Sequence, residues 1–438
     1  MIPLHRLDIS GLRAAYAAGE TTPAAVVEHY LARIDAHDAA IHAYVEVDRD
    51  GARAAAEESG RRIADGTARP LEGVPVAVKA NIAVSGLDWN AGMEARRGIT
   101  AAEDAEAVRR LRAAGAIILG TLNMHEAALG ATTDNAWFGR TINPHREGYT
   151  PGGSSGGSGA AVSAGLCVAS LGTDTMGSVR IPAAYNGVYG IKPTHGTIPD
   201  AGLVPLSEWL DSIGPIARSI DDLEVVLAVL AEPAPATSML TRLVLLDSFD
   251  DLDCEPAVLD AYRRALALLE DMPRTALTLH DTAADVRFAG FVVAARELIT
   301  HLGATRTETA DRLSDELRFM LDYADSRSDA DVARAETIID RTRTRVRDAM
   351  GSDGVLLMPT APQAAFRHST RPPANQSAFT AFANIAGLPA ISIPAGLDDD
   401  DLPVAVQLVG APHSEAALIA LAKKLDAGLA GFVPSPLM

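Results

Sequence analysis

Residues 150–182 read TPGGSSGGSGAAVSAGLCVASLGTDTMGSVRIP, with two loops rich in glycine and small polar residues joined by an apolar segment. The first loop spans 152–159 and the second spans 172–182. Glycine lets the backbone take angles that other residues avoid, and it lets a ligand or another chain segment approach closely. Upstream, GVPVAVK at 73–79 is a continuous β-branched run after a glycine, which predicts a buried strand that ends at Lys79.

Two known loop types offer alternative interpretations of residues 152–159. A phosphate-binding loop requires G-x-x-x-x-G-K-[ST], and no lysine follows these glycines. A nucleophile elbow requires G-x-S-x-G on a turn from a strand into a helix, and GGSSG at 152–156 matches it literally. The preceding residues 143–151, NPHREGYTP, do not have the pattern of a strand, so we do not favour the elbow.

Helical and strand periodicities alternate along the rest of the chain. Thr22 and Pro23 form a cap and first turn that predict a helix from that point. Further helices are expected at 52–65, 103–114, 219–231, 255–271, 328–349 and 377–386 and from about 414. Strands are expected at 73–78, 116–119, 355–358, 389–394 and 403–409. This alternation predicts an α/β fold with a large mixed, mostly parallel sheet covered by helices on both faces.

These segments together resemble the amidase signature family. The two loops and the lysine after GVPVAV carry the resemblance, which covers nearly the whole chain and is least secure at about 235–310. Further matching segments are NGVYGIKPT at 186–194, MPTAP at 358–362, AGLPAISIPAG at 386–396 and LPVAVQLVG at 402–410. The resemblance implies one amidase domain over residues 1–438, with a signature core at about 70–200. A helical excursion at about 250–350 is expected to shape the substrate pocket.

The resemblance also implies hydrolysis of the C–N bond of linear amides through a serine acyl-enzyme. Ser178 matches the nucleophile, Ser154 the bridging serine that follows a cis peptide bond, and Lys79 the general base. Protonated lysine is a poor base, with a pKa near ~10.4, but burial lowers that pKa by up to roughly 3–5 units. The apolar strand supplies such a setting, since no acidic residue lies within six positions of Lys79.

The residues before Ser178 match the oxyanion loop of the family. Backbone N–H groups of Thr175, Met176, Gly177 and Ser178 are implied to stabilise the oxyanion. Met176 departs from the family pattern, which has glycine there, and adds bulk near the acyl site. By the same resemblance, Ala128, Ser154 and Met176 contact the substrate, although a plain core helix is almost as good an interpretation of the segment around Ala128.

Three more residues complete the comparison with the family pattern. Ala80 stands where many members carry aspartate, which leaves the support of Lys79 open. Asp174 and Arg180 match positions that we interpret as scaffolding, which hold the two loops by charge-assisted hydrogen bonds.

Composition narrows the classes of partner. The 438-residue chain has a net charge of −19, which repels phosphate backbones, so nucleic acid is not expected as a direct partner. Two cysteines, Cys167 and Cys254, are too few for a disulfide framework, and the histidines, His125 included, lack ligand spacing. We therefore expect no metal and no cofactor. The start of the chain lacks the apolar stretch of a signal peptide and no window would span a membrane, so a cytoplasmic protein is expected.

Alternatives to a stand-alone amidase remain. One is the amidotransferase A-type subunit of a tRNA-dependent transamidosome, and another is a non-catalytic family member that acts in binding or assembly. The complete set of Lys79, Ser154 and Ser178 argues against the latter. Small amides, arylamides, ureido compounds and esters are all open as substrates, and so is a homodimer.

Overall fold

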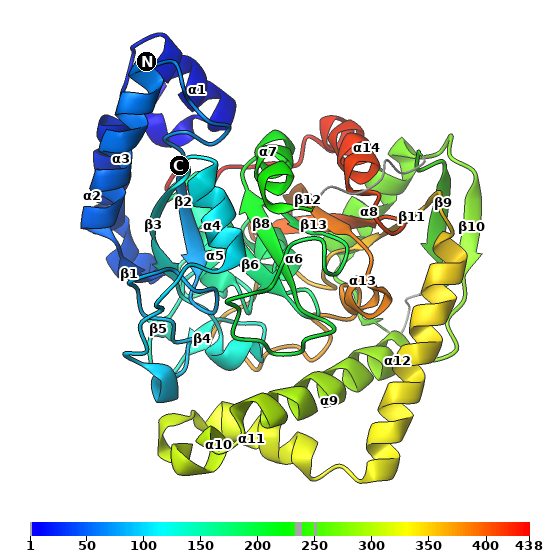
Figure 1. Ribbon diagram of the computed structural model, residues 1–438. Helices are drawn as coiled ribbons and strands as arrows, with labels where there is room; N and C mark the ends of the chain where they lie inside the picture. The colour runs from blue at the N-terminus through cyan, green and yellow to red at the C-terminus, as the bar shows by residue number, and fades with distance from the viewer. Residues whose placement is uncertain (1, 233–238, 249–251) are drawn as a thin grey trace.

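The computed structural model describes residues 2–232, 239–248 and 252–438, and its centre is an eleven-stranded sheet (Figure 1). The strand order is β1-β3-β2-β6-β8-β7-β12-β13-β11-β9-β10. These strands are β1 Tyr44–Val47, β2 Pro75–Lys79, β3 Ile117–Leu122, β6 Ala169–Asp174, β7 Tyr189–Lys192, β8 Ser212–Ala217, β9 Arg242–Leu246, β10 Arg274–Leu277, β11 Gly354–Pro359, β12 Ala390–Leu397 and β13 Pro403–Val409. A separate small hairpin consists of β4 Asp134–Asn135 and β5 Gly139–Arg140.

Helices cover both faces of this sheet. The α-helices are α1 Ile9–Ala17, α2 Pro23–Ile41, α3 Arg49–Ala64, α4 Glu106–Ala113, α5 Gly156–Ser163, α6 Arg180–Tyr185, α7 Ile220–Leu230, α8 Pro256–Leu268, α9 Ala283–Leu302, α10 Thr305–Glu308, α11 Asp315–Asp325, α12 Asp329–Met350, α13 Ala381–Ala386 and α14 Glu415–Leu429. Along β11, Val355 and Leu357 belong to one apolar core, whereas Leu356 and Met358 belong to the other. Because successive strand side chains point to opposite faces, these two cores lie on opposite sides of the sheet.

The mixed α/β sheet is confirmed, but its parallel pairs lie only toward its two ends. The parallel pairs are β3–β2, β2–β6, β11–β9 and β9–β10, and the other six neighbouring pairs are antiparallel. This corrects the expectation of a mostly parallel sheet. The lengths of the connections explain this mixture of directions. Helices α4 and α8 form the long crossovers that parallel pairs need, whereas β12 and β13 are joined by a short hairpin at 398–402 and pair antiparallel. There the N–H of Leu402 donates to the Asp398 carboxylate at 2.8 Å.

Local signals place the expected helices well. Thr22 caps α2, because its hydroxyl accepts the N–H of Ala25 at 3.2 Å, and Pro23 occupies the first turn. Ser328 caps α12 in a reciprocal capping box with Asp331. Each of these two helices therefore begins within a residue or two of the position that the sequence predicts.

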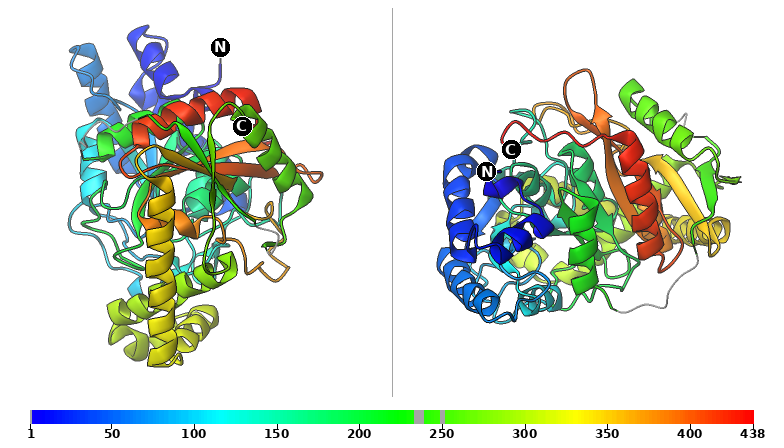
Figure 2. Two further views of the ribbon diagram at one scale, coloured as in Figure 1. Left: turned by 90° about the vertical axis from the view of Figure 1, so that its right-hand side faces the viewer. Right: turned by 90° about the horizontal axis from the view of Figure 1, so that it is seen from above.

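The helical excursion is shorter than the predicted 250–350. Helix α8 packs against strands β11, β12 and β13, and β10 is itself an edge strand of the sheet. Helices α9 to α11 and the beginning of α12 form the arm at the bottom of Figure 1 and of the left view in Figure 2, whereas the rest of α12 returns to contact β10 and β11. Within the described residues, no helix has the length and apolar character needed to cross a membrane.

Candidate active site

Lys79 is the last residue of β2 and is completely buried. Its ammonium nitrogen Nζ lies 2.7 Å from Ser154 Oγ and 2.7 Å from Thr173 Oγ1. Burial lowers the pKa of Lys79 to about 7, and the negative charges of Asp211 and Asp174 oppose that shift. At neutral pH, an amine with this pKa is neutral in a large fraction of molecules and can accept a proton.

Ser154 lies in the first glycine-serine loop, where the peptide bond from Gly153 is cis, as the resemblance implied. The loop fits closely under its neighbour, since a side chain at Gly153 would meet the backbone of residue 131 at 2.7 Å. Thr133 fixes the loop, because its hydroxyl donates to the carbonyl of Gly152 at 2.8 Å. No strand precedes this loop at 141–151, which excludes the nucleophile elbow.

Ser178 lies just before α6 and in the wall of a cavity. The two loops meet directly, since the N–H of Ser155 donates to the carbonyl of Ser178 at 3.2 Å. Among the described residues, no hydrogen bond joins the hydroxyls of Ser154 and Ser178. The structure thus brings Lys79 and Ser154 into contact and places Ser178 beside them. The contact between the hydroxyls of Ser154 and Ser178 is not formed among the described residues. Catalytic hydrogen bonds are often long without substrate.

The loop before Ser178 presents several backbone N–H groups. The N–H of Gly177 already donates to the Asp174 carboxylate at 2.7 Å, so it does not face the oxyanion as predicted. The N–H groups of Thr175, Met176 and Ser178 have no acceptor within the part of the chain that the structure describes. Three of the four predicted donors are therefore free to bind a ligand.

Asp174 and Arg180 form the predicted scaffold, and both side chains are completely buried. The guanidinium donates to both carboxylate oxygens at 2.9 Å and also to Gln407 and Asn384 at 2.8 and 2.6 Å. Burial acts to raise the pKa of Asp174, but the charge and hydrogen bonds of Arg180 lower it to about 2. A carboxylate that stays ionised can hold the loop N–H of Gly177 at every physiological pH.

Sequence reasoning missed two residues around Lys79. Thr173 lies inside the quoted GTDT motif, but its role as the second partner of the lysine had no separate signal. Asp211 follows no motif; it accepts the Thr175 hydroxyl and the N–H of Leu206, the latter at 2.8 Å. Burial raises the pKa of Asp211 to about 6, against the effect of these hydrogen bonds. It supplies negative charge near Lys79, where the chain has Ala80 in place of the family's aspartate.

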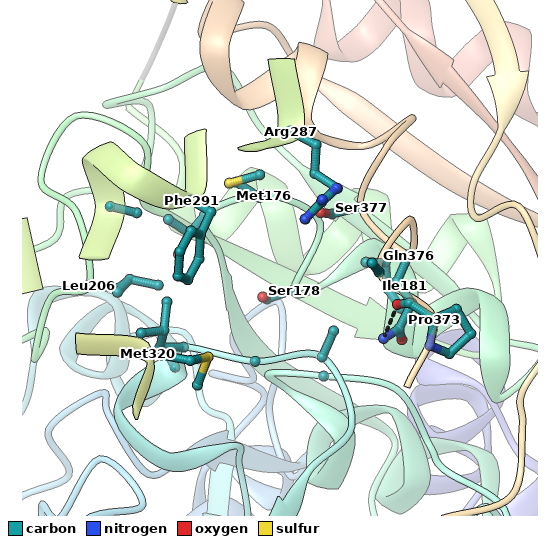
Figure 3. Close-up of a pocket in the computed structure, with 18 residues that line it drawn as sticks. Met176, Ser178, Ile181, Leu206, Arg287, Phe291, Met320, Pro373, Gln376 and Ser377 are labelled. Atoms are coloured by element: carbon teal, nitrogen blue, oxygen red, sulfur yellow. Dashed lines mark hydrogen bonds between the residues drawn. The ribbon is translucent and has the colours of Figure 1, made fainter. Parts of the chain in front are cut away.

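The cavity beside Ser178 has a volume of about 170 Å³ (Figure 3). It is lined by Ala128, Leu129, Gly130, Ala131, Gly153, Thr175, Met176, Ser178, Ile181, Leu206, Arg287, Phe291, Ala294, Met320, Pro373, Ala374, Gln376 and Ser377. Ala128 and Met176 therefore line it, as predicted, whereas Ser154 lies behind the wall in contact with Lys79. Ala128 has a positive φ of 59° and is not part of a plain core helix.

The extra bulk of Met176 is accommodated by a glycine on α9. A side chain at Gly290 would lie 2.8 Å from the Met176 sulfur, closer than real atoms approach. The thioether thus packs against the helix backbone and narrows the cavity from that side. This pairing was not visible in the sequence, because Gly290 lies 114 positions after Met176, in the span that resembles the family least securely.

Comparisons with known proteins show which family and which folds this chain resembles. Residues 25–419 match the family described as Amidase. The A-type subunit of glutamyl-tRNA(Gln) amidotransferase from Synechococcus sp. (strain CC9311) is 33% identical, with 96% of each chain covered. A solved structure from a vestigial protein complex that reveals the evolutionary origins of an s-triazine catabolic enzyme has a TM-score of 0.90 and 31% identity, with 98% of this chain and 100% of that chain covered. Native peptide amidase from Stenotrophomonas maltophilia has a TM-score of 0.85 and 28% identity, with 99% of each chain covered.

Proposed function

Because the chain belongs to the amidase family, we propose that it hydrolyses the C–N bond of a small carboxamide through an acyl-enzyme on Ser178. The Ser178 oxygen attacks the amide carbon, and its proton passes through the Ser154 hydroxyl to Lys79. Lys79 returns the proton to the leaving nitrogen as the C–N bond breaks. Water then hydrolyses the acyl ester by the same proton path, which restores the three side chains.

One observation carries this proposal: the fully buried Lys79 nitrogen lies 2.7 Å from Ser154 Oγ, directly behind a cavity that contains Ser178. Burial alone does not distinguish this lysine, because Lys192 is also completely buried and donates to the carbonyl of Pro193 at 2.6 Å. Lys79 differs in its partners, since it meets two hydroxyl groups in an apolar setting that keeps a large fraction of it neutral. Neutral Lys79 can donate to Thr173 and accept from Ser154 at the same time.

The free N–H groups of Thr175, Met176 and Ser178 support the second requirement of acyl transfer, which is stabilisation of the oxyanion. Removing one such donor typically costs about 3 kcal/mol in the barrier. The cavity is smaller than the roughly 300–1,000 Å³ of sites for drug-sized ligands, which favours a small substrate. We infer that the chain works as one domain, since the excursion supplies walls of this cavity through Phe291 and Met320.

A second candidate is an amidotransferase A-type subunit, which relatives such as the Synechococcus protein favour. Such a protein would use the same Ser178 chemistry on glutamine and pass ammonia on to an aminoacyl-tRNA. The two functions differ in substrate and in dependence on partner subunits, so one experiment separates them.

That experiment measures release of ammonia or amine by the full chain from aliphatic amides, anilides, ureido compounds and glutamine. We expect release that disappears in Ser178→Ala and falls at least ~100-fold in Lys79→Ala and Ser154→Ala. Ser158→Ala is the matched control, because that hydroxyl only donates to the carbonyl of Leu171.

Two outcomes would contradict the proposal. Full activity in Ser178→Ala would exclude the mechanism. Release confined to glutamine, and only in the presence of partner subunits, would establish the second candidate instead.

A further inference from the structure

One face of α9 is directed at the candidate nucleophile. Arg287, Gly290, Phe291 and Ala294 are spaced by i, i+3, i+4 and i+7, which places them on one side of a helix. Three of them line the cavity, and Gly290 packs against Met176 at its edge. Figure 3 shows the Arg287 side chain extending into the cavity beside Ser377, toward the centre where Ser178 lies.

Arg287 has no counter-ion in residues 2–232, 239–248 and 252–438. Its guanidinium makes no ion pair or hydrogen bond there, and burial alone lowers its pKa. Arg296 on the same helix shows the usual arrangement, since it contacts the Asp325 carboxylate at 2.8 Å. The described residues that line the cavity include no aspartate or glutamate, so Arg287 is their one charged side chain.

An unpaired, partly buried cation is costly, and the cost rises when a substrate displaces the remaining water. A neutral substrate would leave the guanidinium without a partner. A carboxylate would pair with it through two parallel N–H···O hydrogen bonds, the geometry that arginine matches best. In a chain with a net charge of −19, an anion also needs such a local positive charge to enter.

We propose that Arg287 binds a carboxylate of the substrate, so that the substrate is an amide that also carries a carboxylic acid, such as a monoamide of a short dicarboxylic acid. This inference rests on the proposed function of Ser178 and names the substrate class for that same cavity. The carboxylate binds at the α9 side, next to the Ser377 hydroxyl, and the amide carbonyl lies at Ser178. Arg287 is then the residue that distinguishes acidic amides from neutral ones.

The test compares kcat/KM for malonamate, succinamate and glutaramate with kcat/KM for the neutral amides butyramide and succinamide. The wild-type chain should prefer at least one acidic amide by on the order of 10–100-fold, the scale of a charge-assisted pair. Arg287→Met should remove that preference, because kcat/KM for the acidic amides should fall at least ~10-fold relative to kcat/KM for the neutral amides. Arg287→Lys should restore part of it, which a merely structural role would not predict.

Arg296→Met is the matched control, because it removes the same charge from α9 outside the cavity and should keep the preference. Equal rates on acidic and neutral amides, both dependent on Ser178, would overturn the carboxylate site and leave the proposed function intact. If the wild-type chain turns over none of these amides in a way that depends on Ser178, the result would instead count against the proposed function.

A binding measurement tests the carboxylate site without turnover. In Ser178→Ala, calorimetry should detect binding of succinate or glutarate, and the added Arg287→Met substitution should weaken it at least ~10-fold. Absence of binding, or binding unaffected by Arg287→Met, would overturn the inference whatever the kinetics show.

Discussion

Replacing Lys79 by methionine should stabilise the protein at neutral pH while it abolishes activity. Because the pKa of Lys79 falls from 10.5 to about 7 on folding, this residue lowers the free energy of unfolding. Each pKa unit corresponds to about 1.4 kcal/mol. At pH 7 the cost is about 4 kcal/mol. Lost hydrogen bonds to Ser154 and Thr173 offset about 1 kcal/mol each, so the variant should be more stable by about 2 kcal/mol.

The pH dependence gives this prediction a definite sign. Between the folded pKa of about 7 and the unfolded value of 10.5, the unfolded chain binds more protons at residue 79 than the folded chain does. Wild-type stability therefore rises with pH in that window relative to Lys79→Met. From pH 7 to pH 9 the lysine cost falls from about 4 to about 2 kcal/mol, so the advantage of the variant should shrink by about 2 kcal/mol.

Denaturant unfolding at pH 7 and pH 9, followed by circular dichroism, measures the two differences in free energy of unfolding. Lys192, which is also buried, remains in both proteins and cancels from the comparison. Lys424→Met is the control, because that lysine is exposed on α14 and its difference from wild type should not depend on pH. A stability gap for Lys79→Met that stays constant or widens from pH 7 to pH 9 would refute the reasoning about the buried amine.

Three further predictions follow from contacts in the site. Activity (kcat/KM) should rise with pH through about 7, as the proposed general base Lys79 loses its proton. Asp211→Asn should move the midpoint of this rise to lower pH, because the Asp211 carboxylate raises the pKa of Lys79. A midpoint that moves to higher pH in pH–rate profiles would contradict this. Gly290→Ala should push the flexible Met176 thioether further into the cavity and lower kcat/KM by less than ~10-fold, and adding Met176→Gly should remove this loss. Additive effects of the two substitutions in kinetic assays would exclude contact between them. Asp174→Asn should lower the free energy of unfolding by about 3–5 kcal/mol by leaving a buried arginine unpaired, whereas Asp50→Asn on exposed α3 should leave it nearly unchanged in the same denaturant assay.

The sequence predicted those features that depend on neighbouring residues. Thr22 and Pro23 mark the start of α2, and the apolar run before Lys79 predicts its buried strand, because capping and periodicity are local properties. The two loops resemble the family closely enough to predict that Lys79, Ser154 and Ser178 lie at one site.

Features that depend on distant contacts could not be predicted. The antiparallel centre of the sheet follows from how β7, β8, β12 and β13 pair, and strand propensity does not encode a partner. Asp211 and Arg287 carry no motif; their roles arise only once the chain folds around β2 and α9. The prediction for the Gly177 N–H was wrong because its acceptor, the Asp174 carboxylate, turns back onto its own loop.

The buried Arg180 cluster has a consequence for when the chain becomes active. Lys79, Ser154 and Ser178 all lie in the first half of the sequence, but Arg180 also needs the side-chain oxygens of Asn384 and Gln407. A chain that ends before these positions would contain every proposed catalytic residue and still leave the loop around Ser178 unsupported. We therefore expect that nearly the entire polypeptide must leave the ribosome before this loop is supported, so that incomplete chains lack the proposed amidase activity.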